Sequence, residues 1–398
     1  MAKLSIDQLE LQGKNVLVRV DFNVPLDDNQ NVRDDFRIRA ALPTIQKIIG
    51  DGGRAILCSH LGRPKGKPVA SMSLKPVAEK LGQLLGKPVN FATDCIGPKV
   101  SQLKKSLQDG DVMLMENLRF YAEEEANDAE FASSLAENCQ LYVNDAFGSA
   151  HRAHASTEGV TKFFAQSAAG YLMEKELKYL GDTLENPERP FVTILGGAKI
   201  SGKIDVINHL QNKADYLLIG GGMIFTFYKA QGKEIGKSLL EEDRLEMARD
   251  ILQNFQASRC KLVLPEDVLI ADKLESGAQS QIVDIDHIPA ERIGVDIGPK
   301  TIEKFIQILQ NSRTVVWNGP MGVFEIPEFA KGTEKIARLL ADLTEQGVTT
   351  VVGGGDSAAA VKKYKLTDQL SHVSTGGGAS LEFLEGKILP GVSALTDA

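Results

Sequence analysis

The stretch FVTILGGAKISGKI (Phe191–Ile204) shows the strand–turn–helix order on which the fold prediction rests. It begins with an apolar, β-branched run typical of a strand, passes through Gly196 and Gly197, and continues into a helical pattern. Glycine lets backbone N–H groups approach a phosphate, and Lys199 and Lys203 follow closely. A P-loop would have Ser or Thr instead of Ile204, so the stretch predicts a phosphate site of another kind. A tight turn beside solvated lysines stays an open alternative.

The same order of strand, loop and helix repeats along the whole chain. Segments with helical periodicity lie between the apolar runs, such as Ile38–Gly50 and Leu240–Phe255. Pro43 falls inside the first of these and is expected to kink or restart that helix. Strands that alternate with helices predict βαβ units and a largely parallel sheet, so the expected fold class is α/β. The apolar runs are NVLVRV, RAILCS, DVMLME, QLYVND, FVTILG, DYLLIG, KLVLP, QIVDI, TVVWN and TTVVGGG.

Length, charge and cysteine usage limit the class of protein. A chain of 398 residues exceeds one ordinary hydrophobic core, so we expect two domains. The net charge of −8 argues against general binding to nucleic acid or to a membrane surface. The four cysteines form no CxxC motif, which predicts free thiols in a reducing compartment. We find neither a signal-peptide core nor an apolar run of membrane-spanning length, and therefore expect a cytoplasmic location.

Short motifs in the first half carry arginine or histidine directly after an apolar run. An arginine fork suits a compact anion with several charges, so together these motifs predict an anionic metabolite as ligand. Each feature also has an ordinary interpretation, because a lone arginine is usually solvated and the histidines can be structural. Asp21 and Asn23 can likewise form an Asx turn before Pro25. The motifs are RVDFNVP (Arg19–Pro25), SHLGRP (Ser59–Pro64), ENLRF (Glu116–Phe120) and AHRAH (Ala150–His154).

Glycine clusters occupy the same position in the second half. In VGGGDS (Val352–Ser357), backbone amides can contact a phosphate and Asp356 can hold Mg²⁺ through its carboxylate. Ser357 is expected to cap the following helix, or alternatively to donate to the phosphate. STGGGAS (Ser374–Ser380) precedes a further helix, whose N-terminus would stabilise transferring charge.

NGPMGVFE (Asn318–Glu325) follows another apolar run. The glycines and the proline mark a turn, which is the ordinary interpretation of this motif. The functional interpretation places Asn318 beside a nucleotide and Glu325 on its ribose hydroxyls. Trp317 is expected to belong to the core. The second half therefore predicts a nucleotide site.

Taken in order, these motifs resemble the phosphoglycerate kinase family. The resemblance spans essentially the whole chain, and the ordered combination is far more specific than any single glycine motif. Ser357 stands where many members have threonine, which keeps the hydroxyl group. The motifs are RVDFNVP, SHLGRP, ENLRF, AHRAHAS, LGGAKIS, GGGM, NGPMGVFE, GGGDS and STGGGAS.

The resemblance implies two Rossmann-like domains with parallel sheets flanked by helices, joined by a hinge helix. The phosphoglycerate-binding domain would comprise residues 1–170, the hinge region 171–188 and the nucleotide-binding domain 189–379. Residues 380–398 would pack back on the first domain. The segment 173–190 suits a hinge because a charged helix there ends at Asn186-Pro187, although a surface helix and loop would read the same.

The resemblance also implies a reaction and its residues. 1,3-Bisphosphoglycerate would transfer a phosphoryl group directly to MgADP after hinge closure, reversibly giving 3-phosphoglycerate and ATP, in a monomer. Arg37 and Lys199, with amides near Gly354 and Gly377, would stabilise the transferring group. The residues implied for the phosphoglycerate site are Asp21, Asn23, Arg37, His60, Arg63, Arg119 and Arg152. Those implied for the nucleotide site are Gly196, Gly197, Lys203, Asn318, Glu325, Gly353, Gly354, Gly355, Asp356 and Ser357, with Asp356 on Mg²⁺.

Other functions fit the sequence less well. A nicotinamide-dependent dehydrogenase would have GxGxxG after the first strand, where this chain has DFNVP. A catalytically silent protein that binds a phosphometabolite or a nucleotide would tolerate loss of Arg37, Lys199 or Asp356, yet all three are present. The acidic balance and an aromatic content of 6% argue against a nucleic-acid partner.

Overall fold

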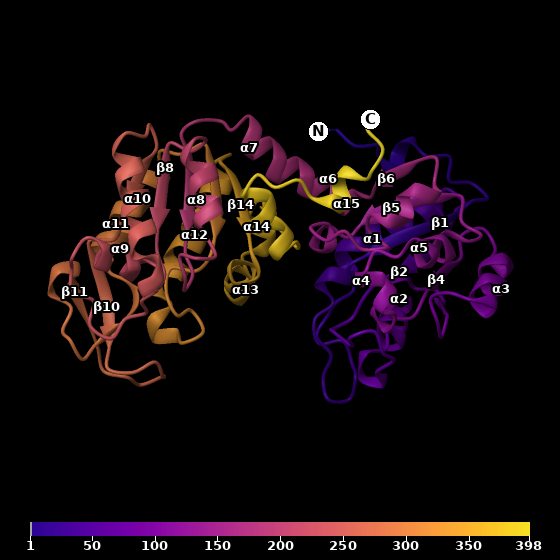
Figure 1. Ribbon diagram of the computed structural model, residues 1–398, viewed down its shortest axis with the longest axis horizontal. Coiled ribbons are helices and arrows are strands. Elements are labelled where there is room, and N and C mark those ends of the chain that lie inside the picture. Colours follow the sequence, from indigo (N-terminus) through magenta and orange to yellow (C-terminus); the bar gives the residue numbers. More distant parts are fainter. Residues whose placement is uncertain (1) are drawn as a thin grey trace. The chain divides into compact units, whose positions relative to one another are not determined.

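The computed structural model describes residues 2–398, which divide into two compact units. The first unit comprises the chain up to Leu177 together with Ile388–Ala398, and the second comprises Lys178–Lys387. Each unit is organised around its own six-stranded parallel sheet with helices packed against it (Figure 1). The predicted fold class, α/β with two Rossmann-like units, is confirmed. Within residues 2–398, no helix has the length and apolar character needed to cross a membrane.

The first sheet has the strand order β3-β4-β2-β1-β5-β6. Strand β1, which has the sequence NVLVRV, is therefore a central strand of this sheet. Every residue of that strand is buried, because helices cover the sheet and a central strand faces protein on both sides. Its neighbours pair with it in parallel, and their carboxyl ends therefore meet at one edge. The strands are β1 (Asn15–Val20), β2 (Arg54–Cys58), β3 (Asn90–Phe91), β4 (Val112–Leu114), β5 (Leu141–Asp145) and β6 (Ser167–Ala169).

The helix predicted over Ile38–Gly50 forms as α1 and is not interrupted at Pro43. Ile38, Ile45 and Ile48 are fully buried, whereas Pro43 lies on the exposed face. Water can therefore bond the carbonyl that proline leaves without a donor, and the helix continues. The expected restart at Pro43 is wrong. The helices of this unit are α1 (Phe36–Gly50), α2 (Lys75–Leu85), α3 (Pro98–Ser106), α4 (Ala122–Glu125), α5 (Ala129–Ala136), α6 (Tyr171–Glu176) and α15 (Pro390–Ser393).

The second sheet has the strand order β15-β14-β13-β7-β8-β9 and is also parallel throughout. Trp317 is fully buried in the core of this unit, as predicted, and its indole N–H donates to the carbonyl of Gly319 at 2.7 Å. The strands are β7 (Phe191–Leu195), β8 (Tyr216–Ile219), β9 (Lys261–Val263), β13 (Thr314–Asn318), β14 (Thr349–Gly353) and β15 (His372–Val373). The helices are α7 (Thr183–Glu185), α8 (Ile204–Gln211), α9 (Ile224–Ala230), α10 (Leu245–Gln256), α11 (Pro299–Leu309), α12 (Lys331–Glu345), α13 (Gly355–Lys363) and α14 (Gly378–Leu384).

The second unit also contains a three-stranded antiparallel sheet that the sequence did not predict. QIVDI, expected as one more parallel strand, lies in the edge strand β11 (Ser280–Asp284) of this sheet. It pairs with β10 (Asp267–Ala271), which pairs in turn with β12 (Ile293–Ile297). The connection between β10 and β11 is too short for a helical crossover, so the chain reverses direction there.

The chain returns to the first unit later than we expected. The return was predicted for 380–398, but α14 belongs to the second unit, where Ala379 and Leu384 are buried, and the return begins at Ile388. The Asn144 side chain then donates to the carbonyl of Gly391 at 3.0 Å, and the N–H of Leu4 donates to Thr396 at 2.8 Å.

The segment predicted as a hinge is helical without a break over residues 171–185. Helix α6 is followed by a π-helical stretch at Leu177–Asp182 and by α7. The division between the units falls within this stretch, after Leu177. A hinge role for residues 171–188 stays a prediction.

Candidate active site

The arginine and histidine motifs of the first unit follow the carboxyl ends of four adjacent strands, β4, β2, β1 and β5. Their side chains converge on His60, which is 6% exposed. Burial lowers the pKa of His60 well below its usual value, and the charges of nearby arginines lower it further. These arginines are Arg19, Arg119, Arg37 and Arg152. The fold therefore concentrates positive charge around a neutral imidazole.

Arg37, in the first turn of α1, is oriented by the loop that follows β1. Its guanidinium donates to both carboxylate oxygens of Asp21 at 3.1 Å and to the carbonyl of Asn23 at 3.2 Å. Asp21 also accepts the N–H of Asn23 at 3.2 Å, which is the Asx turn we had considered. The Asn23 side chain accepts the N–H of Gly62 at 2.9 Å. The turn and the arginine contact coexist, so the ordinary interpretation does not exclude the functional one.

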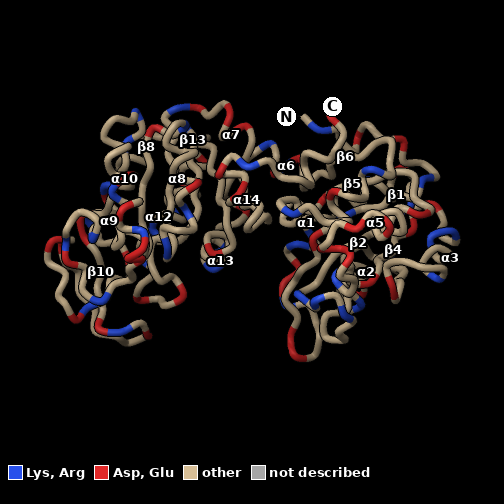
Figure 2. The backbone as a smooth tube through the Cα atoms, viewed as in Figure 1, with Lys and Arg blue, Asp and Glu red and all other residues tan. Residues whose placement is uncertain are grey.

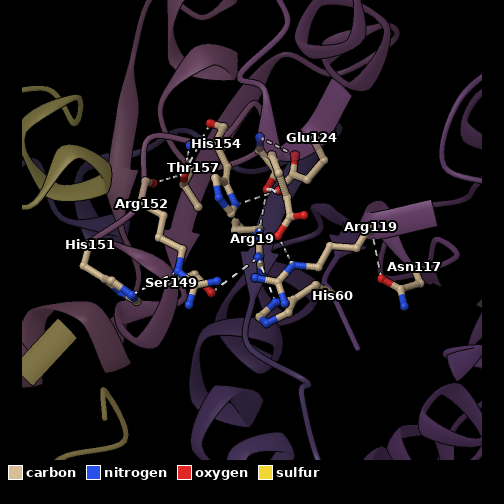
Figure 3. A network of polar contacts seen from close by, with 12 residues as sticks. Arg19, His60, Asn117, Arg119, Glu124, Ser149, His151, Arg152, His154 and Thr157 are labelled. Carbon is tan, nitrogen blue, oxygen red and sulfur yellow. Dashed lines mark hydrogen bonds and ion pairs between the residues drawn. The ribbon is translucent and has the colours of Figure 1, made fainter. Parts of the chain in front are cut away.

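Arg19 contacts His60 and orients its ring, as Figure 3 shows. It is 1% exposed, and its Nη2 lies 3.1 Å from Nδ1 of His60. A guanidinium only donates, so Nδ1 is the acceptor and the neutral ring carries its proton on Nε2. Nε of Arg19 also donates to Oγ of Ser156 at 2.8 Å. His60 is thus both a structurally satisfied histidine and a neutral hydrogen-bond donor through its other nitrogen.

A buried carboxylate, Glu124, supports the loop that carries Arg152. It accepts the backbone N–H of Ser156 at 2.9 Å and the hydroxyl of the same residue at 2.5 Å (Figure 3). Burial raises the pKa of Glu124, and the charge of Arg19 opposes that increase. The polar atoms behind the anion site are therefore paired with one another, which restricts the positions of the arginines above them.

The remaining arginines differ in how strongly they are held. Arg119 is 5% exposed, donates to the carbonyl of Gly62 at 2.8 Å and lies 3.3 Å from Glu125. Arg152 donates from Nε to Nε2 of His151 at 3.1 Å (Figure 3). Arg63 is exposed. Arg119 and Arg152 are thus fixed within the site, whereas Arg63 has its side chain in solvent.

In the second unit, the LGGAKIS, GGGM and NGPMGVFE motifs line a cavity of about 380 Å³, to which VGGGDS contributes Asp356 and STGGGAS contributes no residue among those described. Glu325 and Asp356 lie on its polar side, and both are exposed. Its apolar walls include Phe225, Leu239 and Met321. A concave site with apolar walls and few polar groups suits a flat ring attached to a charged group, as in a nucleotide.

Lys203 lies beside this cavity and contacts Asn318. Its ammonium donates to Oδ1 of Asn318, whose Nδ2 is buried and finds no hydrogen-bond partner among residues 2–398. Burial lowers the pKa of Lys203 to about 8, partly offset by the charge of Asp356. An unpaired buried donor beside a partly desolvated lysine favours the binding of an anion.

Helix α13 begins at Gly355, directly after the strand that ends with Gly353. Gly354 has a φ of +90°, which L side chains rarely adopt, and it precedes the first amides of the helix, which have no partner within the helix. The predicted cap by Ser357 is wrong, because its hydroxyl accepts the N–H of Gly319 at 2.6 Å. Ser357 is fully buried and joins the first turn of α13 to the loop after β13 instead.

Gly196 and Gly197 play a different part from the one we predicted. Their N–H groups donate to the carbonyls of Asn318 and Pro320 at 2.9 and 3.0 Å, so they are not free for a phosphate. A Cβ atom on Gly196 would lie 2.1 Å from the Pro320 carbonyl oxygen. These glycines let the loops after β7 and β13 pack together, and only Gly197 also lines the cavity.

Lys199 and Gly377 complete the set of predicted residues. Lys199 is exposed, beside the loop Leu239–Arg244. Gly377 precedes α14 with a φ of +51° and is half-buried. Figure 2 shows acidic and basic residues interspersed over each unit, so attraction of anions depends on these local groups.

Comparisons with known proteins decide the family. The family model described as phosphoglycerate kinase matches residues 6–387. The chain belongs to the phosphoglycerate kinase family. Among curated relatives, the phosphoglycerate kinase of Chloroherpeton thalassium is 60% identical over 398 residues and that of Chlorobium limicola 58% over 397, each aligned along its whole length. The structure of phosphoglycerate kinase from Coxiella burnetii is 42% identical with a TM-score of 0.90, and that from Pyrococcus horikoshii is 31% identical with a TM-score of 0.85. Each alignment covers 98% of both chains.

As a phosphoglycerate kinase family member, the chain is a kinase that passes a phosphoryl group between 1,3-bisphosphoglycerate and ADP. Its small-molecule substrates are those of the family, 3-phosphoglycerate and ATP in the reverse direction. The catalytically silent alternative is not favoured. The roles of individual residues are not given by these likenesses.

Sequence reasoning missed two groups of residues in this kinase. Arg19 stands in the quoted motif RVDFNVP, but its position within a strand gave no sign that it would contact His60. The cavity walls from the antiparallel sheet, Ile293–Asp296, were also missed. Gly221 and Gly222 also line the cavity, and for these two residues the sequence did contain a local signal, the quoted GGGM motif.

Proposed function

We propose that the first unit binds the phosphoglycerate, the second binds MgADP or MgATP, and the phosphoryl group passes directly between them. The convergence of arginine charges on a neutral His60 is the observation that carries this proposal. A multiply charged metabolite needs several fixed cations, and guanidinium groups stay charged at any physiological pH. The phosphoglycerate ligands are Asp21, Asn23, Arg37, His60, Arg63, Arg119 and Arg152.

The nucleotide is proposed to lie in the cavity of the second unit. Its phosphates would meet Lys203, the free Nδ2 of Asn318 and the first amides of α13, while Glu325 would accept the ribose hydroxyls. Gly197 would contribute to the wall of the cavity rather than donate hydrogen bonds. The proposed nucleotide ligands are Gly197, Lys203, Asn318, Glu325, Gly353, Gly354, Gly355 and Asp356, with Gly196 and Ser357 holding the loops.

Asp356 is proposed to hold Mg²⁺ together with the nucleotide. It is an exposed carboxylate that lines the cavity in the first turn of α13. Residues 2–398 contain no cluster of three or more acidic, histidine or cysteine side chains that would form a complete metal site. One carboxylate suits an ion whose other ligands are water and phosphate oxygens, and such an ion neutralises phosphate charge.

The proposed mechanism relies on fixed positive charge and needs no protein base. The carboxylate of 3-phosphoglycerate is already a nucleophile, and a neutral His60 with its proton on Nε2 donates a hydrogen bond rather than accepting a proton. Arg37 and Lys199 would stabilise the equatorial oxygens of the transferring group, aided by amides near Gly354 and Gly377.

Direct transfer requires the two substrates to meet in line. Because each set of ligands belongs to its own unit, we propose that the segment 171–188 acts as a hinge and that closure excludes water from the acyl phosphate. We also propose that the enzyme acts as a cytoplasmic monomer, the form that the family resemblance favours.

The test is ADP formation from MgATP with and without 3-phosphoglycerate, using a trap for the acyl phosphate to pull the equilibrium. We expect turnover that depends strongly on both 3-phosphoglycerate and Mg²⁺. Binding of both ligands by calorimetry without turnover would overturn the catalytic assignment. Turnover in chelator that matches turnover in Mg²⁺ would overturn the role of Asp356.

A further inference from the structure

Asp296 is a buried carboxylate of the second unit that the proposed mechanism does not use. It lies in β12, is 4% exposed and lines the nucleotide cavity. Its Oδ2 accepts the N–H of Gly332 in the first turn of α12 at 2.7 Å. Its Oδ1 accepts the N–H of Ile297 at 2.9 Å. The carboxylate therefore joins the strand to the start of a helix.

Two glycines keep space for this carboxylate. A Cβ atom on Gly332, or on Gly322 in the loop between β13 and α12, would lie 2.4 Å from Oδ1 of Asp296. Real Cβ contacts essentially never approach so closely, so any larger residue at either position would displace the carboxylate. The carboxylate thus packs against the cavity loop as well as against α12.

The loop Gly319–Glu325 is held between the same two elements. The N–H of Val323 donates to the carbonyl of Val295 in β12 at 2.9 Å. The N–H of Met321 donates to the hydroxyl of Thr333, the residue after Gly332, at 3.0 Å. Met321, Val323 and Glu325 line the cavity. Any change in the distance between β12 and α12 would therefore move the lining of the cavity.

We propose that Asp296 is a positioning residue for the nucleotide, because it fixes the start of α12 to β12 and so holds the cavity loop in its binding conformation. It acts through Met321 and Glu325 rather than through the reacting atoms. This inference rests on the proposed nucleotide site.

The electrostatic surroundings make the contact sensitive to pH. Burial raises the pKa of Asp296 to about 7, and the N–H groups of Gly332 and Ile297 oppose that increase. Protonation would weaken these charge-assisted hydrogen bonds, so nucleotide affinity is expected to fall as the pH drops below 7. Lys237, Glu325 and Asp356 line the same cavity as Asp296. Burial raises the pKa of Tyr364 and the charge of Asp296 raises it further, and the other charged neighbours of Tyr364 are Glu334 and Arg338 of α12.

Asp267 provides a matched control in the same antiparallel sheet. It lies in β10, is 1% exposed and accepts the N–H groups of Lys300 and Thr301 at the start of α11, at 3.0 and 2.8 Å. A Cβ atom on Gly298 would lie 2.3 Å from its Cγ. Asp267 is not among the described residues that line the cavity. Both aspartates tie a helix to a strand, but only one of them faces the nucleotide.

The experiment compares Asp296→Asn and Asp267→Asn in the full-length enzyme by calorimetry with MgADP and, separately, with 3-phosphoglycerate. We expect Asp296→Asn to weaken MgADP binding about tenfold, the loss of roughly one charge-assisted hydrogen bond, with 3-phosphoglycerate binding unchanged. The difference in MgADP affinity between Asp296→Asn and the unsubstituted enzyme should become smaller as the pH is lowered from 8 to 6. Asp267→Asn should lower the melting temperature without weakening MgADP binding.

Two outcomes would overturn the inference. One is unchanged MgADP affinity in a folded Asp296→Asn enzyme, and the other is an equal loss in Asp267→Asn. If Asp296→Asn does not fold, Gly332→Ala displaces the carboxylate from outside the cavity, and Gly298→Ala is its control. Failure of the unsubstituted enzyme to bind MgADP would instead contradict the proposed function.

Discussion

The two proposed anion sites differ in their physical means. In the first unit, charged side chains would form the site, and buried polar groups hold them in place: Asp21 holds Arg37, and Arg19 holds His60. In the second unit, backbone turns would form much of the site, because Gly354, with a φ of +90°, directly precedes the first amides of α13. A site made of side chains needs a paired network behind it, whereas a site made of backbone needs residues that tolerate strained turns.

The largest expected effect concerns Arg37 and Lys199, one side chain from each unit, which are proposed to act on the same transferring phosphoryl group. Arg37→Ala and Lys199→Ala should each lower kcat by about 10²–10³-fold, because each removes a fixed charge from the transferring phosphoryl group. Steady-state kinetics at saturating substrates measures this. Arg39→Ala is the control, since Arg39 lies on the same helix and its side chain is 58% exposed beside Asp35. Near-normal kcat in both variants would contradict their assigned roles.

The next effect tests the network of the first unit. Arg19→Met should destabilise this unit by about 3 kcal/mol, because it leaves Glu124 and Ser156 without their buried cationic partner. It should also weaken 3-phosphoglycerate binding while leaving MgADP binding unchanged. Thermal unfolding and calorimetry measure both. Arg54→Met, which removes a partly exposed arginine paired with Asp109, should change neither ligand affinity. A matching loss of MgADP affinity in Arg19→Met would argue against separate sites.

The proposed backbone site is tested by a pair of glycines with nearly the same φ. Gly354 and Gly347 have φ values of +90° and +89°, but Gly347 lies in the turn between α12 and β14. Replacing either by alanine should cost about 1–2 kcal/mol of stability. Only Gly354→Ala should also weaken MgADP binding, measured by calorimetry. Equal MgADP affinities in the two variants would show that this turn does not shape the nucleotide site.

The smallest effect is a difference in pH dependence between the sites. Burial lowers the pKa of Lys203 to about 8, so in the free enzyme this lysine loses its charge as the pH rises through that value. Affinity for MgADP should therefore fall by up to about fivefold between pH 8 and pH 9, whereas affinity for 3-phosphoglycerate, which depends on arginines, should stay flat. Lys203→Arg should flatten the MgADP profile. Parallel profiles for the two ligands would contradict this assignment.

Much of the fold was predictable because its signals are local. Ile38, Ile45 and Ile48 recur with a helical period, and α1 buries that face. The run Phe191–Leu195, apolar except for Thr193, became a central strand. The antiparallel sheet was missed because a short apolar run such as QIVDI does not show the direction of its partner strand. The late return of the chain, at Ile388, depended on which unit buries α14.

The sequence predicted residues for the candidate site, but it did not predict the hydrogen-bond partner of each group. The motifs follow the strands as expected, yet the N–H groups of Gly196 and Gly197 bind carbonyls at the end of β13 and in the loop after it. Ser357 receives the N–H of Gly319 instead of capping its own helix. These partners lie far along the chain, so no local pattern could identify them.

The sequence by itself determined the order of strands and helices, the positions of the loops that bear chemistry, and the division into a side-chain half and a glycine half. Periodicity and turn residues specify these features because they depend on neighbours within a few positions. Only the tertiary structure decided which nitrogen of His60 carries its proton, which glycine amides are free, and which strand completes the nucleotide cavity. Those outcomes depend on hydrogen bonds and packing between segments far apart in sequence, which form only when the sheets assemble.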